Sequence, residues 1–375
     1  MRLSSHSILF IAVLCTLAFV SCKQSNTDTH SIEALTNYAA RGFEIYPTDN
    51  GYRLRVLNPS QYSKNNSFEY NLSRNSQHQA NTISIPVKNV ICCSTTHVAF
   101  LSALGQESSI SGVSGGNHIY NYNLQLLYQQ NVIKELGYDN SLNQELIISL
   151  KPDIVFAYGI DNRSLGNFQK IEQAGIPVVW IGEYLENQLL GRTEWLKFFA
   201  CFYDCLDMAS KTYDSITNCY NNLSDNASEL YNTQPLVISG LPWQGVWYVP
   251  GGDSYMAHAI ADAGGKYLFD NNSQRESIPL SMEELFDKAG NAKVWINLNN
   301  IHSKREILQS DSRFNKFEPL HSAGIYNNNK RINENGGNDF WESGLIHPDK
   351  ILNDLIMIFH QNDCPDDSLF YYKKL

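Results

Sequence analysis

The chain has 375 residues, of which 43% are hydrophobic and 18% are charged, and its formal net charge is -10. This length and balance indicate one bilobed protein or two to three globular units with a buried core. The acidic charge excludes a nucleic-acid partner, because phosphate backbones attract basic surfaces.

The first residues are typical of an export signal. Arg2 is followed by the apolar run from Ile8 to Val20, which is too short to span a membrane as a stable helix. The run ends in Phe19-Val20-Ser21-Cys22, which resembles a bacterial lipobox. We therefore expect a lipoprotein signal peptide over 1–21 and a lipid anchor on Cys22, and no other segment is predicted to cross a membrane.

Residues 22–86 are predicted to form a tether and a β-hairpin. The tether is the polar stretch 23–31. Two alternating segments, 42–47 and 52–59, flank Asp49-Asn50-Gly51, which is a strong hairpin signal. The polar stretch 62–81 is expected to be a surface loop.

From residue 87 onward, short apolar strands alternate with helices. Strands are predicted over 90–92, 110–113, 154–157 and 177–181, and helices over 98–104, 131–136 and 144–150. This alternation favours a parallel sheet covered on both faces, here an N-terminal lobe over 87–190.

A long segment without Gly or Pro follows. Residues 192–230 carry apolar side chains at helical spacing, so we expect one long bridging helix, straight or kinked, over 191–233. A second α/β lobe over 234–362 has predicted strands at 236–239, 246–249 and 294–297 and helices at 254–263 and 348–359. The last residues, 363–375, are expected to be a polar tail.

The eight cysteines carry little information. Cys15 leaves with the signal peptide, and Cys22 carries lipid. Cys92 and Cys93 are adjacent, and Cys201 and Cys205 lie one helical turn apart, so neither pair has zinc-finger spacing. We interpret them as small core residues, and no disulfide is assigned.

Several motifs occur in a characteristic order. They are Ser94-Thr95-Thr96-His97 with the helix after it, Ile110 to Ser114, Leu150-Lys151-Pro152-Asp153-Ile154-Val155, Gly175-Ile176-Pro177-Val178, Gly251 to Tyr255, Asp262 to Gly265, Gly337 to Gly344 and His347-Pro348-Asp349. Together they resemble the periplasmic binding proteins that carry ferric siderophores, haem and cobalamin. The resemblance covers roughly 87–360 and leaves the N-terminal hairpin unexplained.

The resemblance implies an α/β fold of two lobes with short parallel sheets, joined by one long helix, with the ligand in the cleft between them. It implies a monomeric, non-enzymatic lipoprotein of a Gram-negative periplasm that delivers a metal chelate to an ABC permease and its ATPase. The chelate is cargo, so no cofactor is expected. The resemblance also assigns permease docking to Glu145 and Glu283. The alternative is that both are first-turn glutamates favoured by the helix dipole.

Ligands of open α/β sheets bind beyond the carboxyl ends of the strands. The candidates at such positions are Thr96, His97, Asn117, His118, Tyr120, Tyr158, Tyr184, Trp243, Trp247, Tyr255 and Asn297. A surface of aromatic and amide groups suits a large, flat, mostly neutral ligand. The alternative is that these rings wall the seam between the lobes. His97 and His118 are interpreted as hydrogen-bonding residues rather than metal ligands, and no dedicated metal site is predicted.

Two other functions stay open. Gly112-Val113-Ser114-Gly115-Gly116 matches the G-x-S-x-G pattern of a hydrolase nucleophile, although the stretch after it does not continue smoothly into a buried helix. The hairpin and the Asn-rich loops would also suit a cell-surface interaction lipoprotein. No P-loop pattern occurs in the sequence.

Overall fold

Two five-stranded sheets organise the chain in its computed structural model. The structure describes residues 33–59, 66–75, 81–138, 141–159, 166, 168–230, 233–242, 245–322, 324–360 and 366–375. The predicted signal peptide, Cys22 and Trp243 lie outside this part. No helix within it is long and apolar enough to cross a bilayer.

The first sheet belongs to the N-terminal lobe and is entirely parallel, with the order β7-β6-β5-β8-β9. Its strands are β5 (Val90–Cys92), β6 (Ile110–Val113), β7 (Lys134–Glu135), β8 (Ile154–Tyr158) and β9 (Val178–Ile181). Its helices are α1 (Thr95–Ala103), α2 (Tyr122–Gln129), α3 (Gln144–Leu150) and α5 (Gln169–Gln173). Apolar clusters cover both faces of this sheet, which explains why its strands are continuous apolar runs.

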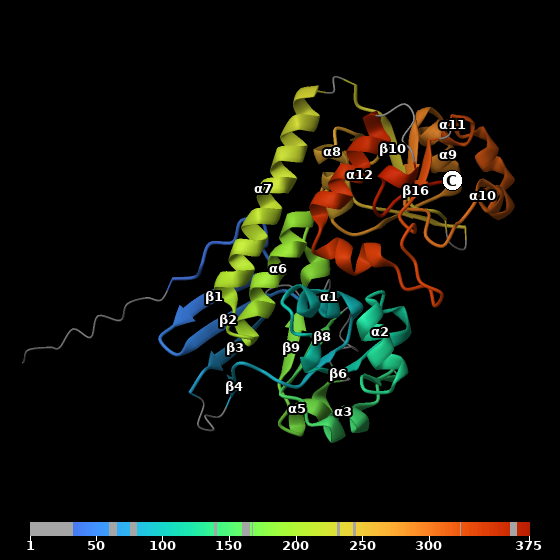
Figure 1. Ribbon diagram of the computed structural model, residues 1–375. Helices are drawn as coiled ribbons and strands as arrows, with labels where there is room; N and C mark the ends of the chain where they lie inside the picture. The colour runs from blue at the N-terminus through green and yellow to red at the C-terminus, as the bar shows by residue number, and fades with distance from the viewer. Residues whose placement is uncertain are drawn as a thin grey trace, which may run out of the picture. The chain divides into compact units, whose positions relative to one another are not determined.

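The second sheet has the order β12-β10-β14-β15-β16, with only β16 antiparallel. Its strands are β10 (Leu236–Ser239), β12 (Lys266–Tyr267), β14 (Val294–Ile296), β15 (Ile325–Asn327) and β16 (Lys373–Lys374). Its helices are α8 (Tyr255–Asp262), α9 (Met282–Lys288), α10 (Lys304–Ser310), α11 (Glu318–His321) and α12 (Pro348–His360). The predicted fold class, two α/β lobes with short parallel sheets, is confirmed (Figure 1). The predicted strand at 246–249 pairs elsewhere, as β11 (Trp247–Val249) with β13 (Ile278–Leu280).

The N-terminal hairpin is part of a four-stranded sheet, β1 (Phe43–Thr48), β2 (Gly51–Leu57), β3 (Ser67–Ser73) and β4 (Thr82–Ser84). Thr48 pairs with Gly51, so Asp49 and Asn50 form the predicted turn. We expected a loop over 62–81, and this prediction was wrong for β3. Along β3, the side chains of Phe68, Tyr70 and Leu72 face the protein, and the residues between them face solvent. Polar neighbours in the sequence had concealed this period of two.

Two helices occupy the segment in which we expected one. α6 (Leu189–Phe202) and α7 (Leu206–Leu230) are separated at Asp204, whose φ of 55° is left-handed. The Asp204 carboxylate accepts a hydrogen bond from the Nε of Arg74, at 2.7 Å, which holds this break. α7 then runs back beside α6 and continues to the C-terminal lobe (Figure 1). At 25 residues it is about 37 Å long and is the bridging helix.

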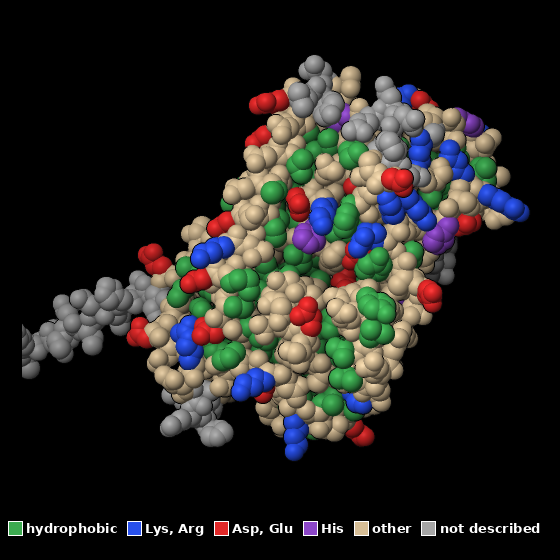
Figure 2. Space-filling view, viewed as in Figure 1, with side chains coloured by type: hydrophobic (Ala, Val, Ile, Leu, Met, Phe, Trp, Pro, Cys, Tyr) green, Lys and Arg blue, Asp and Glu red, His purple; other side chains and the backbone are tan. Residues whose placement is uncertain are grey.

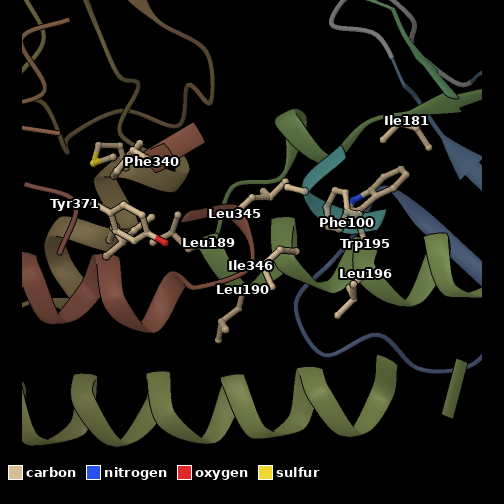
Figure 3. Close-up of a cluster of buried hydrophobic side chains, with 14 of the residues drawn as sticks. Phe100, Ile181, Leu189, Leu190, Trp195, Leu196, Phe340, Leu345, Ile346 and Tyr371 are labelled. Carbon is tan, nitrogen blue, oxygen red and sulfur yellow. The ribbon is translucent and has the colours of Figure 1, made fainter. Parts of the chain in front are cut away.

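α6 carries the cores of both lobes. Figure 3 shows Leu189 and Leu190 of α6 between Phe340 and Tyr371 on one side and Phe100 and Trp195 on the other. All of these side chains belong to one continuous buried cluster. Because this core crosses the junction, rotating one lobe against the other would expose apolar surface.

Two further local predictions were wrong. The helix expected over 131–136 lies earlier, as α2, because Asn121 caps its start and Asn131 follows it with a left-handed φ of 59°. Part of the expected polar tail is also packed in the core, because Leu369, Tyr371 and Tyr372 are buried. The backbone N–H groups of residues 370–372 donate to the buried carboxylate of Asp354 at 2.7 to 3.1 Å, and β16 closes the second sheet.

Candidate ligand site between the lobes

A cavity of about 750 Å³ lies where α1 and α2 face the C-terminal segment 331–347. We call it the inter-lobe cavity. Its walls come from both lobes and consist of Ala99, Ser102, Ala103, Tyr120, Asn121, Tyr122, Asn123, Gln125, Arg331, Ile332, Asn333, Asp339, Glu342, Ser343, Ile346 and His347. Its volume is within the range of about 300 to 1,000 Å³ typical of small-molecule sites.

Glu342 joins the lobes at the wall of this cavity. Its carboxylate accepts hydrogen bonds from the backbone N–H groups of Tyr120, at 2.6 Å, and Asn121, at 2.9 Å. Beside it, the Nδ2 of Asn333 donates to the carbonyl of Ile119 at 2.8 Å. Burial raises the pKa of Glu342 to about 7, although both N–H donors oppose that shift.

Arg331 is the one Arg or Lys side chain of the cavity wall, and it is already engaged. Its Nε forms an ion pair with Asp339 at 2.5 Å. Its guanidinium also lies over the rings of Tyr120, 5.3 Å from the centroid, and Phe370, at 4.4 Å. The described wall therefore offers an anionic ligand no Arg or Lys that lacks an ion pair. On the face in Figure 2, acidic, basic and hydrophobic side chains are intermixed over most of the surface.

Tyr120 is the predicted candidate that lines the inter-lobe cavity. Asn117 and His118 are exposed just before it, in the 3-10 turn Gly116–His118. Gly337 packs so closely that a Cβ there would lie 2.4 Å from the carbonyl oxygen of His118. Thr96 is half-buried, and its hydroxyl is 2.9 Å from that of Ser94, the cap of α1.

His97, Tyr158 and Tyr184 form an aromatic row beyond β8. The ring centroids of His97 and Tyr158 are 6.5 Å apart, and those of Tyr158 and Tyr184 are also 6.5 Å apart. The Tyr184 hydroxyl donates to the carbonyl of Gly159 at 2.6 Å. His97 is fully enclosed, and burial lowers its pKa to about 3, so its imidazole is neutral. The structure thus places His97 in the core and only its two tyrosine neighbours near the surface.

The C-terminal candidates are dispersed. Trp247 is fully buried, stacks on Trp295 at 5.4 Å, and donates its Nε1–H to the carbonyl of Ser239. Asn297 accepts a hydrogen bond from the hydroxyl of Tyr372 at 2.9 Å. Tyr255 is half-buried beneath the guanidinium of Arg192. These residues support the fold around the seam, and none of the three lines the inter-lobe cavity.

Glu145 and Glu283 are both exposed in the first turns of their helices, α3 and α9. Asn143 and Ser281 cap these helices through their side-chain oxygens, so neither glutamate is needed as a cap. Glu284, the neighbour of Glu283, pairs with Lys288 at 2.7 Å. Their exposure is what docking would require, and their role stays a prediction.

Sequence reasoning assigned no role to Asp339 or Glu342, although both lie in a segment that carried the family resemblance. A usable signal was present, because Asn338-Asp339-Phe340-Trp341-Glu342 places two acids among large apolar side chains. Buried acids need donors, and these two find them in Arg331 and in the opposite lobe.

Ser114 does not have the surroundings of a hydrolase nucleophile. It is buried directly after β6, and its backbone N–H donates to the carbonyl of Cys92. Within the described ranges, its hydroxyl forms no hydrogen bond with a histidine or a carboxylate, as an activated serine requires. A 3-10 turn follows it in place of the helix of a nucleophile elbow.

Comparison with known proteins decides the family. The family model described as periplasmic binding protein matches residues 90–318. The chain belongs to the periplasmic binding protein family. An uncharacterized lipoprotein of Methanocaldococcus jannaschii is 25% identical over 291 residues, which cover 74% of this chain and 66% of that relative.

Solved structures share the fold of this periplasmic binding protein. A possible iron-binding periplasmic solute-binding protein from Staphylococcus epidermidis aligns with a TM-score of 0.58 at 18% identity, covering 74% of this chain and all of that one. A periplasmic heme binding protein from Pseudomonas aeruginosa aligns with a TM-score of 0.56 at 15% identity, covering 77% and 99% of the two chains. The four-stranded N-terminal sheet lies before the residues that the family model matches.

Proposed function

We propose that this protein is the substrate-binding lipoprotein of an ABC importer and captures a metal chelate between its lobes. The observation that carries the proposal is the inter-lobe cavity of about 750 Å³ in a member of the periplasmic binding protein family. The lipid on Cys22 keeps the protein at the membrane, and the permease receives the cargo.

The charge of the wall favours particular chelates. Arg331 is neutralised by Asp339, while Glu342 and the aromatic rings of Tyr120 and Tyr122 add acidic and apolar surface. A catecholate siderophore with several negative charges would need free arginines. Cobalamin, haem or a weakly charged iron chelate fits this wall better.

The N-terminal sheet favours a structural role over a separate docking function. Backbone N–H groups of residues 38–40 donate to Glu194, and those of residues 41 and 42 donate to Glu186. Phe43, Leu54 and Val56 are buried in the main core. The N-terminal extension thus packs as an integral part of the N-terminal lobe.

The experiment is a ligand panel on the unlipidated protein that begins at Lys23. Tryptophan fluorescence is recorded with cobalamin, cobinamide, haem, and ferric hydroxamate and catecholate siderophores. We expect saturable quenching by one weakly charged chelate, with a Kd of about 1 μM or below. A folded protein that binds no chelate would refute the cargo assignment and favour the interaction lipoprotein.

A further inference from the structure

Arg192 is a buried cation that forms no ion pair with any residue in the described ranges. It is the fourth residue of α6 and only 9% exposed. Its Nε is fully enclosed and has no hydrogen-bond partner in the described part of the chain. Its guanidinium carbon lies 4.7 Å from the centroid of the Tyr255 ring. Burial raises the pKa of Tyr255, and the nearby guanidinium opposes that rise.

No acid on the surrounding elements forms an ion pair with Arg192 in the part of the chain that the structure describes. Five of these acids are engaged by other residues: Glu186 by Trp195, Glu194 by Lys197, Asp253 by Arg275, Asp339 by Arg331, and Glu342 by Tyr120. The Oε2 of Glu183, just before α6, is buried without a hydrogen-bond partner among the described residues. A guanidinium keeps its charge in proteins, and a charge enclosed without a partner is costly. A cation–π contact returns only about 0.5 to 2 kcal/mol. No carboxylate of the described residues therefore forms an ion pair that compensates the charge of Arg192.

A small cavity adjoins this side chain. It has a volume of about 10 Å³, which is enough for about one water-sized particle. Besides Arg192 and Tyr255, its walls include Leu189, Phe340, Trp341 and Leu345. Figure 3 shows Leu189, Phe340 and Leu345 within a cluster of buried hydrophobic side chains. Because the walls are mostly apolar, they favour an anion that loses its hydration water easily. The small volume of the cavity excludes a whole phosphate or sulfate ion.

The start of α6 adds to the positive potential. Gln188, its capping residue, makes no side-chain hydrogen bond to the first turn. The amide groups of an uncapped first turn and the helix dipole both favour a negative charge nearby. Arg192 and this helix start therefore act on the same small space, which Leu189 also lines.

We propose that Arg192 binds one small monovalent anion in this cavity, either free chloride or a single carboxylate oxygen of the bound cargo. Both sources offer the same chemistry, one weakly hydrated negative atom beside a guanidinium and an aromatic face. The second source rests on the proposed function, whereas the first does not.

The test uses bromide, a chloride analogue that quenches tryptophan fluorescence, on the chelate-free mature protein. Gluconate holds the ionic strength constant. Because Trp341 lines the cavity, we expect saturable quenching that chloride competes away and that Trp341→Phe removes. Arg192→Met should weaken bromide binding at least fivefold. Arg305→Met, at an exposed position on α10, is the matched control and should leave it unchanged.

The cargo arm uses the chelate that the panel identifies. If its carboxylate occupies the cavity, the chelate displaces bromide, and Arg192→Met weakens the acid form at least tenfold but not an amide or ester form. If bromide binds and the chelate does not displace it, the occupant is a free anion. If quenching is linear in bromide and Arg192→Met changes neither bromide nor chelate binding, the proposal is wrong.

If Arg192→Met fails to fold, the wild-type protein alone can still test whether the anion site exists. Its melting temperature should rise saturably when chloride replaces gluconate at constant ionic strength. A melting temperature that is independent of chloride, together with a chelate whose acid and amide forms bind equally, would overturn the proposal. The bromide titration uses no chelate, so it can disprove the anion site while the proposed transport function stands. Equally, the chelate panel can disprove the transport function while the anion site stands.

Discussion

The carboxylate of Glu342 accepts the backbone N–H of Tyr120 across the junction of the two lobes, at an N···O distance of 2.6 Å. Glu342 is only 5% exposed, so water competes little for this bond. The bond lies beside the continuous core that α6 carries through both lobes. Together these features oppose a wide hinge motion, and we expect scattering curves that compact little when ligand binds.

Glu342 should make stability depend on pH. Its folded-state pKa of about 7 lies above the ordinary value of 4.5, so the folded protein holds a proton there that the unfolded chain releases. Between pH 4.5 and 7, this group therefore lowers the free energy of unfolding as pH rises, by roughly 3 kcal/mol in all. Glu342→Gln should remove that slope, as measured by urea unfolding at pH 5, 6, 7 and 8.

The matched control for Glu342 is Glu334→Gln, an exposed carboxylate in the same C-terminal segment. We expect its pH profile to run parallel to that of the wild type. If the Glu342→Gln profile also runs parallel, the carboxylate is not held protonated in the fold.

His97 should act in the opposite direction. Its pKa of about 3 lies below the ordinary 6.5, so below pH 6.5 the unfolded chain takes a proton that the folded protein refuses. This group therefore costs roughly 1.4 kcal/mol of stability for each pH unit between 6.5 and 3. His97→Leu should remove that loss, while His118→Leu, at an exposed position, should not. Equal acid sensitivity of wild type and His97→Leu would contradict a neutral, buried imidazole.

The hydroxyl of Tyr372 should stabilise the C-terminal lobe. Tyr372 is fully buried and donates to the Oδ1 of Asn297 at 2.9 Å. Tyr372→Phe keeps the ring but leaves the half-buried Asn297 without this donor, at a cost of about 1 kcal/mol in the free energy of unfolding. Tyr122→Phe, at a side chain that is 69% exposed, should cost almost nothing in the same urea experiment. Two equal midpoints would mean that the tail is not docked as the structure has it.

Charge reversal of Glu145 and Glu283 should separate binding from transport. Both carboxylates are exposed and neither lines the inter-lobe cavity, so the double variant Glu145→Lys and Glu283→Lys should keep its affinity for the chelate. We expect uptake into cells to fall at least about tenfold, because reversed charges oppose a complementary partner. Glu334→Lys is the control, with uptake unchanged. Normal uptake by the double variant would exclude docking through these residues.

Much of the fold follows from local patterns. The strands at Val90–Cys92, Ile154–Tyr158 and Val178–Ile181 are short, continuous apolar runs, as strands buried on both faces must be. The turn at Asp49 and Asn50 was equally predictable, because few sequences suit the two-residue turn of a β-hairpin. The caps Ser94 and Ser281 mark the starts of α1 and α9 in the same way.

The candidate site was less predictable, because it depends on residues far apart in the chain. Tyr120 and Glu342 are 222 positions apart, and no local period brings a buried acid to a particular pair of N–H groups. At the break between α6 and α7, Asp204 likewise has a distant partner, Arg74, which lies in the turn after β3.

The sequence by itself determined the family and much of the order of strands and helices, since these rest on composition, short-range period and motif order. The export signal stays a prediction, because it lies outside the described residues. Only the tertiary structure decided that His97 and Trp247 are enclosed, that residues 370–372 are docked, and that the Nε of Arg192 finds no hydrogen-bond partner among the described residues. The physical reason is that burial and pairing are properties of contacts, and each contact needs a second residue that the local sequence does not specify.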